Sequence, residues 1–449
     1  MQFAFNRFGV RLPKRGAFAC AGVDLMSPAS KDGDIVLCDG HPSSAAEWHA
    51  GWALVLVSLL GYAVSTTHSY TIGVFMPHIE SEFGWTRADV SNGVLAYSVV
   101  AAMLSPAAGF LIGRFGIRRV GIPGMIAYCL SLALLSCATP SIGLWWGLWS
   151  LIGTTSVLVK PTLWGTAVSR QFVRQRGTAL AIVLCGSSLC SAVAPSLVNG
   201  MIGHYGWRST YLGAAAVSAV FLVPLMFLLF RNGGGASAGE AGAALPHAEK
   251  EGWGVLMGRS ILSYRFFAIA LPALLMTTAV MGIVVHFVPM LVSTGLESGT
   301  ATRLTAALGA GSILGRLVTG ALLDRIPGHL TGSMAFLLLL IPIALLLSGV
   351  HGSAGLALVA LLVGFSFGSE MDVTIYLSTR YFDSRTLSTI LGSVMGLLML
   401  GNGIGAALAG RIFDATGDYR LFLVAVIPLV LISSILTRTL GPCPRAAAL

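Results

Sequence analysis

Two short stretches of the 449-residue sequence, GFLIGRFGIRR at residues 109–119 and GALLDR at residues 320–325, share a pattern of glycine and charge. Each has a glycine, a second position four residues later and then an arginine: Gly109, Gly113 and Arg114 in the first, and Gly320, Asp324 and Arg325 in the second. The offset is 211 residues (320 − 109) at all three positions. A constant offset predicts a chain built from two similar halves.

The repeat extends outward from these two stretches. Arg170 in SRQFVRQR matches Arg380 in STRYFDSR at an offset of 210 (380 − 170). Farther along each half, Gly200 in GMIGHYGWR matches Gly410 in GRIFDATGDYR, again at an offset of 210 (410 − 200). Three separate landmarks at nearly one spacing favour a duplicated unit over chance similarity.

The composition points to lipid as the solvent. Hydrophobic residues make up 55% of the chain, charged residues 10%, and the mean hydropathy is +0.83. One water-soluble core could not bury this much apolar surface. Because a helix needs about 20 apolar residues to cross a bilayer, the apolar runs predict twelve spans, near residues 50–76, 90–112, 120–139, 142–168, 177–201, 209–230, 265–291, 303–322, 330–350, 354–379, 387–409 and 421–438.

The predicted fold class is an all-α membrane protein with twelve transmembrane helices in two six-helix bundles. A polar, glycine- and alanine-rich stretch, residues 231–262, cannot pack a core and is predicted to be a cytoplasmic linker. The other predicted parts are a disordered cytoplasmic N-terminal tail, the two bundles and a cytoplasmic C-terminal tail: residues 1–48, 49–230, 263–439 and 440–449. A true start at Met26 is an equal alternative to the long N-terminal tail.

The basic residues predict the orientation of the chain, whose formal net charge is +9. With a cytoplasmic N-terminus, most arginines and lysines outside the spans lie inside, and few arginines face the exterior: Arg87, Arg208, Arg303, Arg411 and Arg420. The positive-inside rule then predicts a multi-pass protein of the inner (plasma) membrane with both termini cytoplasmic. Since topology accounts for the positive charge, the expected partner is the lipid bilayer and not nucleic acid.

The sequence offers no sign of enzyme chemistry. The seven cysteines show no CxxC pair or metal spacing, so no metal is expected. The motif GxxxxGK[ST] is absent, which argues against a nucleotide, and no catalytic constellation or cofactor motif stands out. We interpret the glycines of GAGSILG (309–315) and GNGIG (401–405) as small residues that let helices approach closely.

The loops after the second and eighth spans, GFLIGRFGIRR and GALLDR, match parts of the form G-x-x-x-D-R-x-G-x-R-R, and the chain from Gly51 to Thr439 thereby resembles the major facilitator superfamily. The first copy departs from the pattern at Gly113, where an acidic residue is usual. The resemblance implies a gating contact at the cytoplasmic ends of the helices. Its residues here are Arg114, Asp324 and Arg325.

Four longer motifs resemble the monocarboxylate porter branch, including relatives of oxalate/formate exchangers. They are GVFMPHIESEFGWTRADVS after the first span, QFVRQRGTALAIVLCGS entering the fifth, GRLVTGALLDR in the eighth and GRIFDATGDYR before the twelfth. This resemblance implies small organic anions as substrates.

Ionisable residues inside the predicted spans are the candidates for function, because a charge at the bilayer centre is costly unless it is paired or hydrated. Four of them lie at similar depth: Lys160, Arg316, Glu370 and Asp372. Arg316, for example, precedes Asp324 by eight residues, which is about 12 Å along a helix. We expect the four side chains to meet centrally.

Arg316 is the predicted substrate-binding residue, because a guanidinium holds a carboxylate through two parallel hydrogen bonds. The family's eighth-span arginine implies the same role. The alternative is that Arg316 only pairs with Asp372 or Glu370 and locks helices together. In vertebrate-like members an acidic residue precedes this arginine by one turn, but Ser312 stands there in this chain. The tenth span is therefore expected to supply the proton site.

Glu370 and Asp372 are the predicted proton-coupling residues of that span. Positions two residues apart are about 200° apart around a helix, so the two carboxyls cannot face one cavity. We favour Glu370 as the proton site and Asp372 as the intramolecular partner. Because burial disfavours a charged carboxylate and a nearby cation favours it, substrate arrival at Arg316 is expected to release or capture a proton.

Three further groups complete the candidate site. Lys160 precedes Pro161, a residue that bends helices and often lines cavities; an anion contact and a snorkelling side chain are equal alternatives. Tyr70 stands where some family members carry a substrate-binding lysine, so it is a substrate-binding candidate by position but lacks that charge. For His68 and His286, hydrogen bonds to serine or threonine neighbours are commoner than a role as proton relay.

Together these features predict secondary transport of small organic anions, principally monocarboxylates, by alternating access with proton symport. Uptake is weakly favoured over export. The alternatives are an anion exchanger, a transporter of neutral small molecules or drugs on the same fold, and a non-transporting membrane sensor.

Overall fold

The computed structural model describes residues 44–172, 175–230, 263–350, 352–382 and 384–442. These residues are almost entirely helical and belong to one compact unit of the chain. The linker and most of the two predicted tails lie outside the described residues, whereas residues 44–48 of the predicted N-terminal tail belong to the first helix.

Within the described residues, the first half contains seven α-helices. They are α1 (Ser44–Ser65), α2 (Thr67–Phe83), α3 (Arg87–Phe115), α4 (Ile117–Leu134), α5 (Ile142–Ser156), α6 (Pro161–Gln171) and α7 (Arg176–Leu229). The 54 residues of α7 would extend for about 80 Å if straight, far more than a hydrocarbon core about 30 Å thick. A non-helical glycine, Gly206 (φ 75°, ψ 164°), breaks α7 into two spans.

The described part of the second half contains eight α-helices. They are α9 (Tyr264–Val285), α10 (Phe287–Ser293), α11 (Ser298–Leu323), α12 (Gly328–Leu337), α13 (Leu340–Leu347), α14 (Ser353–Tyr381), α15 (Ser384–Thr416) and α16 (Arg420–Thr439). Several long spans, such as α9 with α10 and α12 with α13, are continued through short breaks, so two segments together cross the membrane once.

Among the described residues, 11 helical stretches are long and apolar enough to cross a membrane. The break at Gly206 divides the longest of them, which brings the number of spans to twelve and confirms the predicted fold class. The helices are longer than the apolar runs. Residues 77–83, which follow the predicted first span (50–76), continue its helix as far as Phe83, and the eleventh span reaches Thr416 instead of residue 409.

The helix ends explain this difference. A helix satisfies its own backbone hydrogen bonds, so it can continue into the polar headgroup region until a residue stops it. Gly84 (φ 68°) ends α2, and Gly417 (φ 77°) follows α15, both in the left-handed region that favours glycine. Thr86 then starts α3 through a capping box with Asp89.

Two of the helices, α11 and α14, pack through glycines on both sides. A Cβ atom built on Gly311 or Gly315 would overlap the carbonyl oxygens of Leu361 and Phe365, and one built on Gly364 would overlap that of Leu308. Only helices without side chains at these positions can approach so closely. The interpretation of the GAGSILG glycines as packing residues is confirmed.

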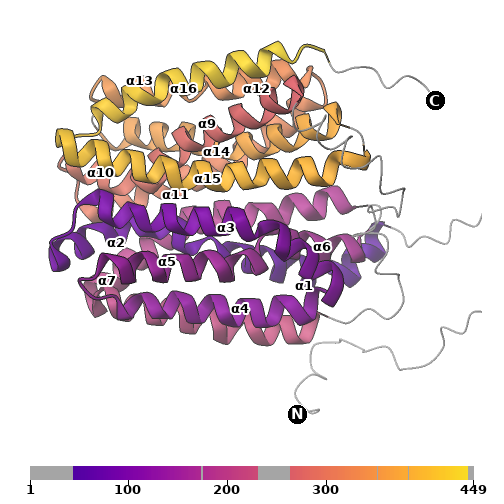
Figure 1. The fold of residues 1–449 in the computed structure, drawn as a ribbon, viewed down its shortest axis with the longest axis horizontal. Coiled ribbons are helices and arrows are strands. Elements are labelled where there is room, and N and C mark those ends of the chain that lie inside the picture. Colours follow the sequence, from indigo (N-terminus) through magenta and orange to yellow (C-terminus); the bar gives the residue numbers. More distant parts are fainter. Residues whose placement is uncertain (1–43, 173–174, 231–262, 351, 383, 443–449) are drawn as a thin grey trace, which may run out of the picture. The chain divides into compact units, whose positions relative to one another are not determined.

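The two halves meet at one end of the molecule and separate toward the other. We call these the Arg87 end, where α3 begins, and the linker end, where α1 begins and α16 finishes. In Figure 1 the linker end lies to the right and α10 marks the Arg87 end to the left. Helices from the two halves contact each other along α3 with α15 and along α7 with α11.

The space around the glycines of α15 shows where this helix lies close to α3 and where the two helices separate. A Cβ atom built on Gly410 would lie 2.9 Å from Ser91 Oγ, and one on Gly403 would lie 2.7 Å from Ser98 Cβ. On Gly396 its nearest neighbour across the interface would be 3.9 Å away, and on Gly392 nothing would lie within 4 Å. The interface between the halves is therefore closed at the Arg87 end and opens toward the linker end.

Substituting Gly364 by alanine tests the glycine packing. The new methyl group would force α11 and α14 apart, at a cost of about 1–3 kcal/mol typical of overpacking. We expect a clearly lower midpoint of thermal unfolding in detergent for Gly364→Ala. The matched control is Gly392→Ala, a helical glycine with open space around it, which should unfold at the wild-type midpoint or above. Equal midpoints for both variants would contradict the packing account.

Candidate functional site

The fourth span is broken at Lys160. Helix α5 is followed by a 3-10 turn (Val157–Val159), Lys160 is extended (φ −73°, ψ 173°), and α6 starts at Pro161. Proline suits the first position of a helix because it has no N–H to leave unpaired. The Trp164 indole donates to the Val159 carbonyl at 2.7 Å and so satisfies one backbone group at the break. The bend expected from Pro161 is confirmed, and it lies in the middle of a membrane span.

The ammonium group of Lys160 lies among aromatic side chains. Its Nζ donates to the Tyr97 hydroxyl at 2.5 Å and lies 5.3 Å from the centre of that ring. The His68 ring packs edge-on against Tyr97 with 4.4 Å between centroids. Within the described residues, Lys160 forms no ion pair with a carboxylate. Lys160 is thus a cation held by a neutral phenol.

The buried His68 is fixed on one side only. Its Nδ1 lies 2.9 Å from the Tyr128 hydroxyl, which donates its own proton to the Val64 carbonyl at 3.1 Å. His68 therefore donates through Nδ1, and Nε2 has no hydrogen-bond partner in the described part of the chain. The partner is a tyrosine, not the serine or threonine neighbour expected from the sequence.

Arg316 lies in α11 and pairs with Asp372 of α14. The Nη1 atom is 2.9 Å from Asp372 Oδ1, and the two side chains are 7% and 24% exposed. Arg316 Nε is buried without any acceptor in the described structure. Since a guanidinium offers five N–H groups, the pair with Asp372 leaves donors available for a second anion.

Glu370 faces another neighbour. It is 3% exposed, and its Oε1 accepts a hydrogen bond from Thr277 of α9. Asp372, two residues later, faces α11 instead. The two carboxyls therefore point to different helices, as their spacing predicts, and no ion pair of Glu370 is found among the described residues.

The four intramembrane charges do not form one cluster. Arg316 and Asp372 are joined, whereas no hydrogen bond or ion pair links Lys160 or Glu370 to them in the described residues. The repeat offset of 210 (370 − 160) relates Lys160 to Glu370. Equivalent positions of the two halves thus carry side chains of opposite charge. Lys160 contacts Tyr97 of the first bundle, and Glu370 contacts Thr277 of the second.

Tyr70 lies between the two halves. Its ring packs edge-on against Phe367 of α14 with 5.9 Å between centroids, and Arg316 is close enough to act on it electrostatically. Tyr70 also lines a small cavity of about 10 Å³ with Gly73 and Thr305, among other residues of α2, α7, α9, α10 and α11. Tyr70 therefore lies at the interface between the halves, within electrostatic range of Arg316.

Cys185 of α7 approaches the same pair. It is half-buried, and Arg316 and Asp372 both act on it electrostatically. One turn nearer the Arg87 end, Ser188 and Ser312 hydrogen bond across the halves at 2.8 Å. That contact closes the interface on the Arg87 side of Arg316, which leaves Cys185 on the side that opens toward the linker end.

The predicted gating residues lie at the linker end. Arg114, Asp324 and Arg325 are all exposed, and none of them forms a hydrogen bond or an ion pair within the described residues. The structure does not bring these residues together, because the two halves are separated at this end. The gating role remains a prediction for a state in which the linker end closes.

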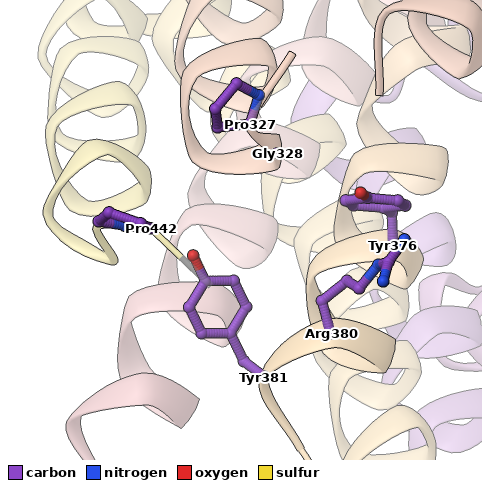
Figure 2. Close-up of a pocket in the computed structure, with 6 residues that line it drawn as sticks. All are labelled: Pro327, Gly328, Tyr376, Arg380, Tyr381 and Pro442. Atoms are coloured by element: carbon purple, nitrogen blue, oxygen red, sulfur yellow. The ribbon is translucent and has the colours of Figure 1, made fainter. Parts of the chain in front are cut away.

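A larger cavity, of about 310 Å³, lies at the linker end within the second half (Figure 2). Its lining comes from α12, α14 and the residues after α16. Figure 2 shows the guanidinium of Arg380 beside the Tyr376 ring, 5.3 Å from its centre. Arg380 follows Asp372 by eight residues, about 12 Å along the helix. This cavity is therefore separate from the Arg316 pair and from the interface between the halves.

The Arg87 end is held by a set of contacts that the sequence interpretation missed. Asp414 of α15 accepts hydrogen bonds from the backbone N–H groups of Arg87 and Ala88 at 3.1 and 2.7 Å. The Arg87 side chain donates to the Tyr419 hydroxyl at 2.7 Å and lies 3.6 Å over the Phe413 ring. Both partners belong to the motifs GWTRADVS and GRIFDATGDYR, but nothing in either motif alone indicates that they meet.

A family model described as Major Facilitator Superfamily matches residues 58–392. The chain is 27% identical to monocarboxylate transporter 13 of Bos taurus over 380 residues, which cover 84% of this chain and 86% of that protein. It is also 27% identical to monocarboxylate transporter 11 of Homo sapiens over 394 residues, covering 85% and 80% of the two chains.

Solved structures share the fold at low identity. A bacterial homologue of the human lysosomal transporter Spinster, in an inward-facing and unoccupied conformation, superposes with a TM-score of 0.66 at 14% identity. The superposition covers 89% of this chain and 97% of that one. This likeness supports the fold alone.

The reactivity of Cys185 tests which end of the interface is open. In a variant that keeps Cys185 as its single cysteine, an anionic methanethiosulfonate reagent should react faster from the linker end, because Arg316 attracts it there. The reaction can be followed by mass spectrometry on oriented vesicles. A variant that keeps only the buried Cys190 should stay unmodified. Faster reaction from the Arg87 end would contradict this geometry.

Proposed function

Because the chain belongs to the major facilitator superfamily, we propose that it transports small organic anions, principally monocarboxylates, together with protons. The observation that carries this proposal is Arg316, a buried guanidinium with an unpartnered Nε beside the interface between the halves. An unsatisfied buried donor on a permanent cation suits a carboxylate ligand. The names of the monocarboxylate transporter relatives support the same substrate class.

The pair of Arg316 with Asp372 supplies a route to proton coupling. A substrate carboxylate first contacts the free Nε of Arg316 and then competes with Asp372 for the rest of the guanidinium. A displaced Asp372 would be a buried carboxylate without its cation, a costly state that proton uptake relieves. One anion and one proton then enter the site together, which is symport.

This geometry favours Asp372 as the proton-binding residue, the reverse of the preference drawn from sequence. Glu370 accepts from Thr277 and lacks a cationic partner among the described residues, so substrate binding at Arg316 would not change its surroundings directly. Glu370 remains the alternative proton site. Because both residues are carboxylates on the same helix, replacing each one by its amide gives two matched variants that distinguish the two proton sites.

Lys160 and Tyr70 are proposed to complete the substrate site from the first half. The hydroxyl that Lys160 contacts on Tyr97 carries no negative charge to neutralise the ammonium group, and Tyr70 lies within electrostatic range of Arg316. The positive charge of Lys160 would further stabilise a carboxylate at Arg316, and the rest of the substrate would contact the tyrosine rings.

We further propose that the linker end is cytoplasmic and that the chain lies in the plasma membrane with both termini inside, as the distribution of basic residues predicts. The structure then corresponds to a state open to the cytoplasm. In the opposite state, Arg114, Asp324 and Arg325 would take part in closing the linker end.

Replacing Arg316 by glutamine tests the anion site. Loss of charge-assisted hydrogen bonds worth about 1.5–3 kcal/mol should raise the half-saturating substrate concentration about 10- to 100-fold. The measurement is uptake of radiolabelled pyruvate, lactate and benzoate into proteoliposomes with an inward proton gradient. The control is Arg303→Gln, an exposed arginine on the same helix that, among the described residues, hydrogen bonds only to Thr300. Unchanged uptake in Arg316→Gln would refute the site.

The amides Asp372→Asn and Glu370→Gln distinguish the two proton sites. An amide mimics the neutral carboxyl, so Asp372→Asn should still exchange labelled for unlabelled substrate but lose accumulation driven by a proton gradient. Glu370→Gln should keep both activities. The reverse result would assign the proton to Glu370, and gradient-driven accumulation in both variants would contradict coupling through this helix.

A further inference from the structure

His286 lies at a break in the seventh span, between α9 and α10, and is completely buried. Three segments surround its ring at the Arg87 end. Nε2 lies 3.0 Å from the carbonyl oxygen of Ala406 in α15 and 3.2 Å from Ser91 Oγ in α3. Nδ1 lies 2.9 Å from the hydroxyl of Tyr419. His286 therefore joins both halves where they are in contact.

These partners fix the protonation state of His286. The Ala406 carbonyl can only accept, so Nε2 carries a hydrogen. The Tyr419 oxygen already accepts from Arg87, and its own proton needs an acceptor, which Nδ1 supplies. In the closed arrangement His286 is neutral, and the hydrogen bonds run in one direction, from Arg87 to Tyr419, from Tyr419 to His286 and from His286 to Ala406.

A second proton on His286 would disrupt this row. Nδ1 would become a donor, the Tyr419 hydroxyl would lose its acceptor, and two cations, Arg87 and the imidazolium, would both direct N–H groups at one phenol oxygen. The charged and titratable groups of this region, among the described residues, are Arg87, Glu80, Asp414 and Tyr419. Glu80 lies 3.5 Å from Arg87, and Asp414 caps α3, so neither accepts from His286.

We propose that His286 is a proton-binding site of the transport cycle and that the Arg87 end closes only after His286 has released its proton. This rests on the proposed function in one respect, because it requires that the chain alternate between two open ends. When the Arg87 end opens, the imidazole meets water and can bind a proton from that side. Acidity there then favours the open state.

Linkage sets the size of the effect. Suppose that the closed state binds no proton and that the imidazole of the open state titrates at about pH 6.5, as histidines in water do. The ratio of open to closed molecules then rises as the open state binds its proton. Between about pH 8 and about pH 5 that ratio should rise about 30-fold. This change in the ratio requires only the protonation of His286 and no substrate.

The test is a distance across the Arg87 end. Spin labels are placed on Ser81→Cys in α2 and Thr294→Cys beside α10, both exposed positions, in a full-length chain without its native cysteines. Electron–electron resonance in nanodiscs then gives the open and closed distance populations at several pH values. We expect the wild-type distances to shift toward the open population as the pH falls.

His286→Gln is the decisive variant. A glutamine amide can donate to Ala406 and accept from Tyr419 but binds no proton, so the end should close normally and stop responding to pH. His68→Gln, the buried histidine of the first half, should respond as the wild type does. His286→Asn replaces the variant if glutamine prevents folding.

The possible results separate this inference from the proposed function. A persistent pH shift in His286→Gln, or no shift in the wild type, would overturn the role of His286 even if anion symport were demonstrated. A shift that depends on His286 would support it even if the substrate were neutral, since the distances are measured without substrate.

Discussion

The buried ion pair of Arg316 with Asp372 is the interaction on which the proposed site depends. A guanidinium at this depth in a bilayer is stable only beside a counter-charge, and the two residues lie on separate helices. They meet because α11 and α14 approach at backbone contact distance, which their facing glycines permit: Gly311, Gly315, Gly364 and Gly368. Small residues without chemistry of their own thus determine where the charge can be held.

The two ends of the molecule differ in how the halves interact. Toward the linker end α3 and α15 separate, and the exposed Arg114 and Arg325 form no hydrogen bond or ion pair within the described chain. At the Arg87 end, backbone caps, aromatic contacts and a buried histidine cross the interface. Access to Arg316 therefore comes from one side, and a cycle of transport requires the network at the Arg87 end to be broken and remade.

The sequence alone predicted two kinds of feature: those that repeat between the halves, and those that follow from placing apolar residues in lipid. The offset between the halves and the apolar runs predicted twelve spans, and Pro161 predicted the break beside Lys160. The contact of Asp414 with Arg87, 327 residues apart, left no periodic signal. Hydropathy also does not define how a helix is rotated about its axis, so the different neighbours of Glu370 and Asp372 became clear only from packing.

The central claim is that an anion and a proton share one site because Asp372 and the substrate compete for Arg316. Calorimetric titration of the purified protein with pyruvate, in buffers of different ionisation enthalpy, measures the protons taken up per anion bound. The account predicts uptake of about one proton at neutral pH, lost in Asp372→Asn. Binding of pyruvate without proton uptake, or uptake that persists in Asp372→Asn, would contradict it.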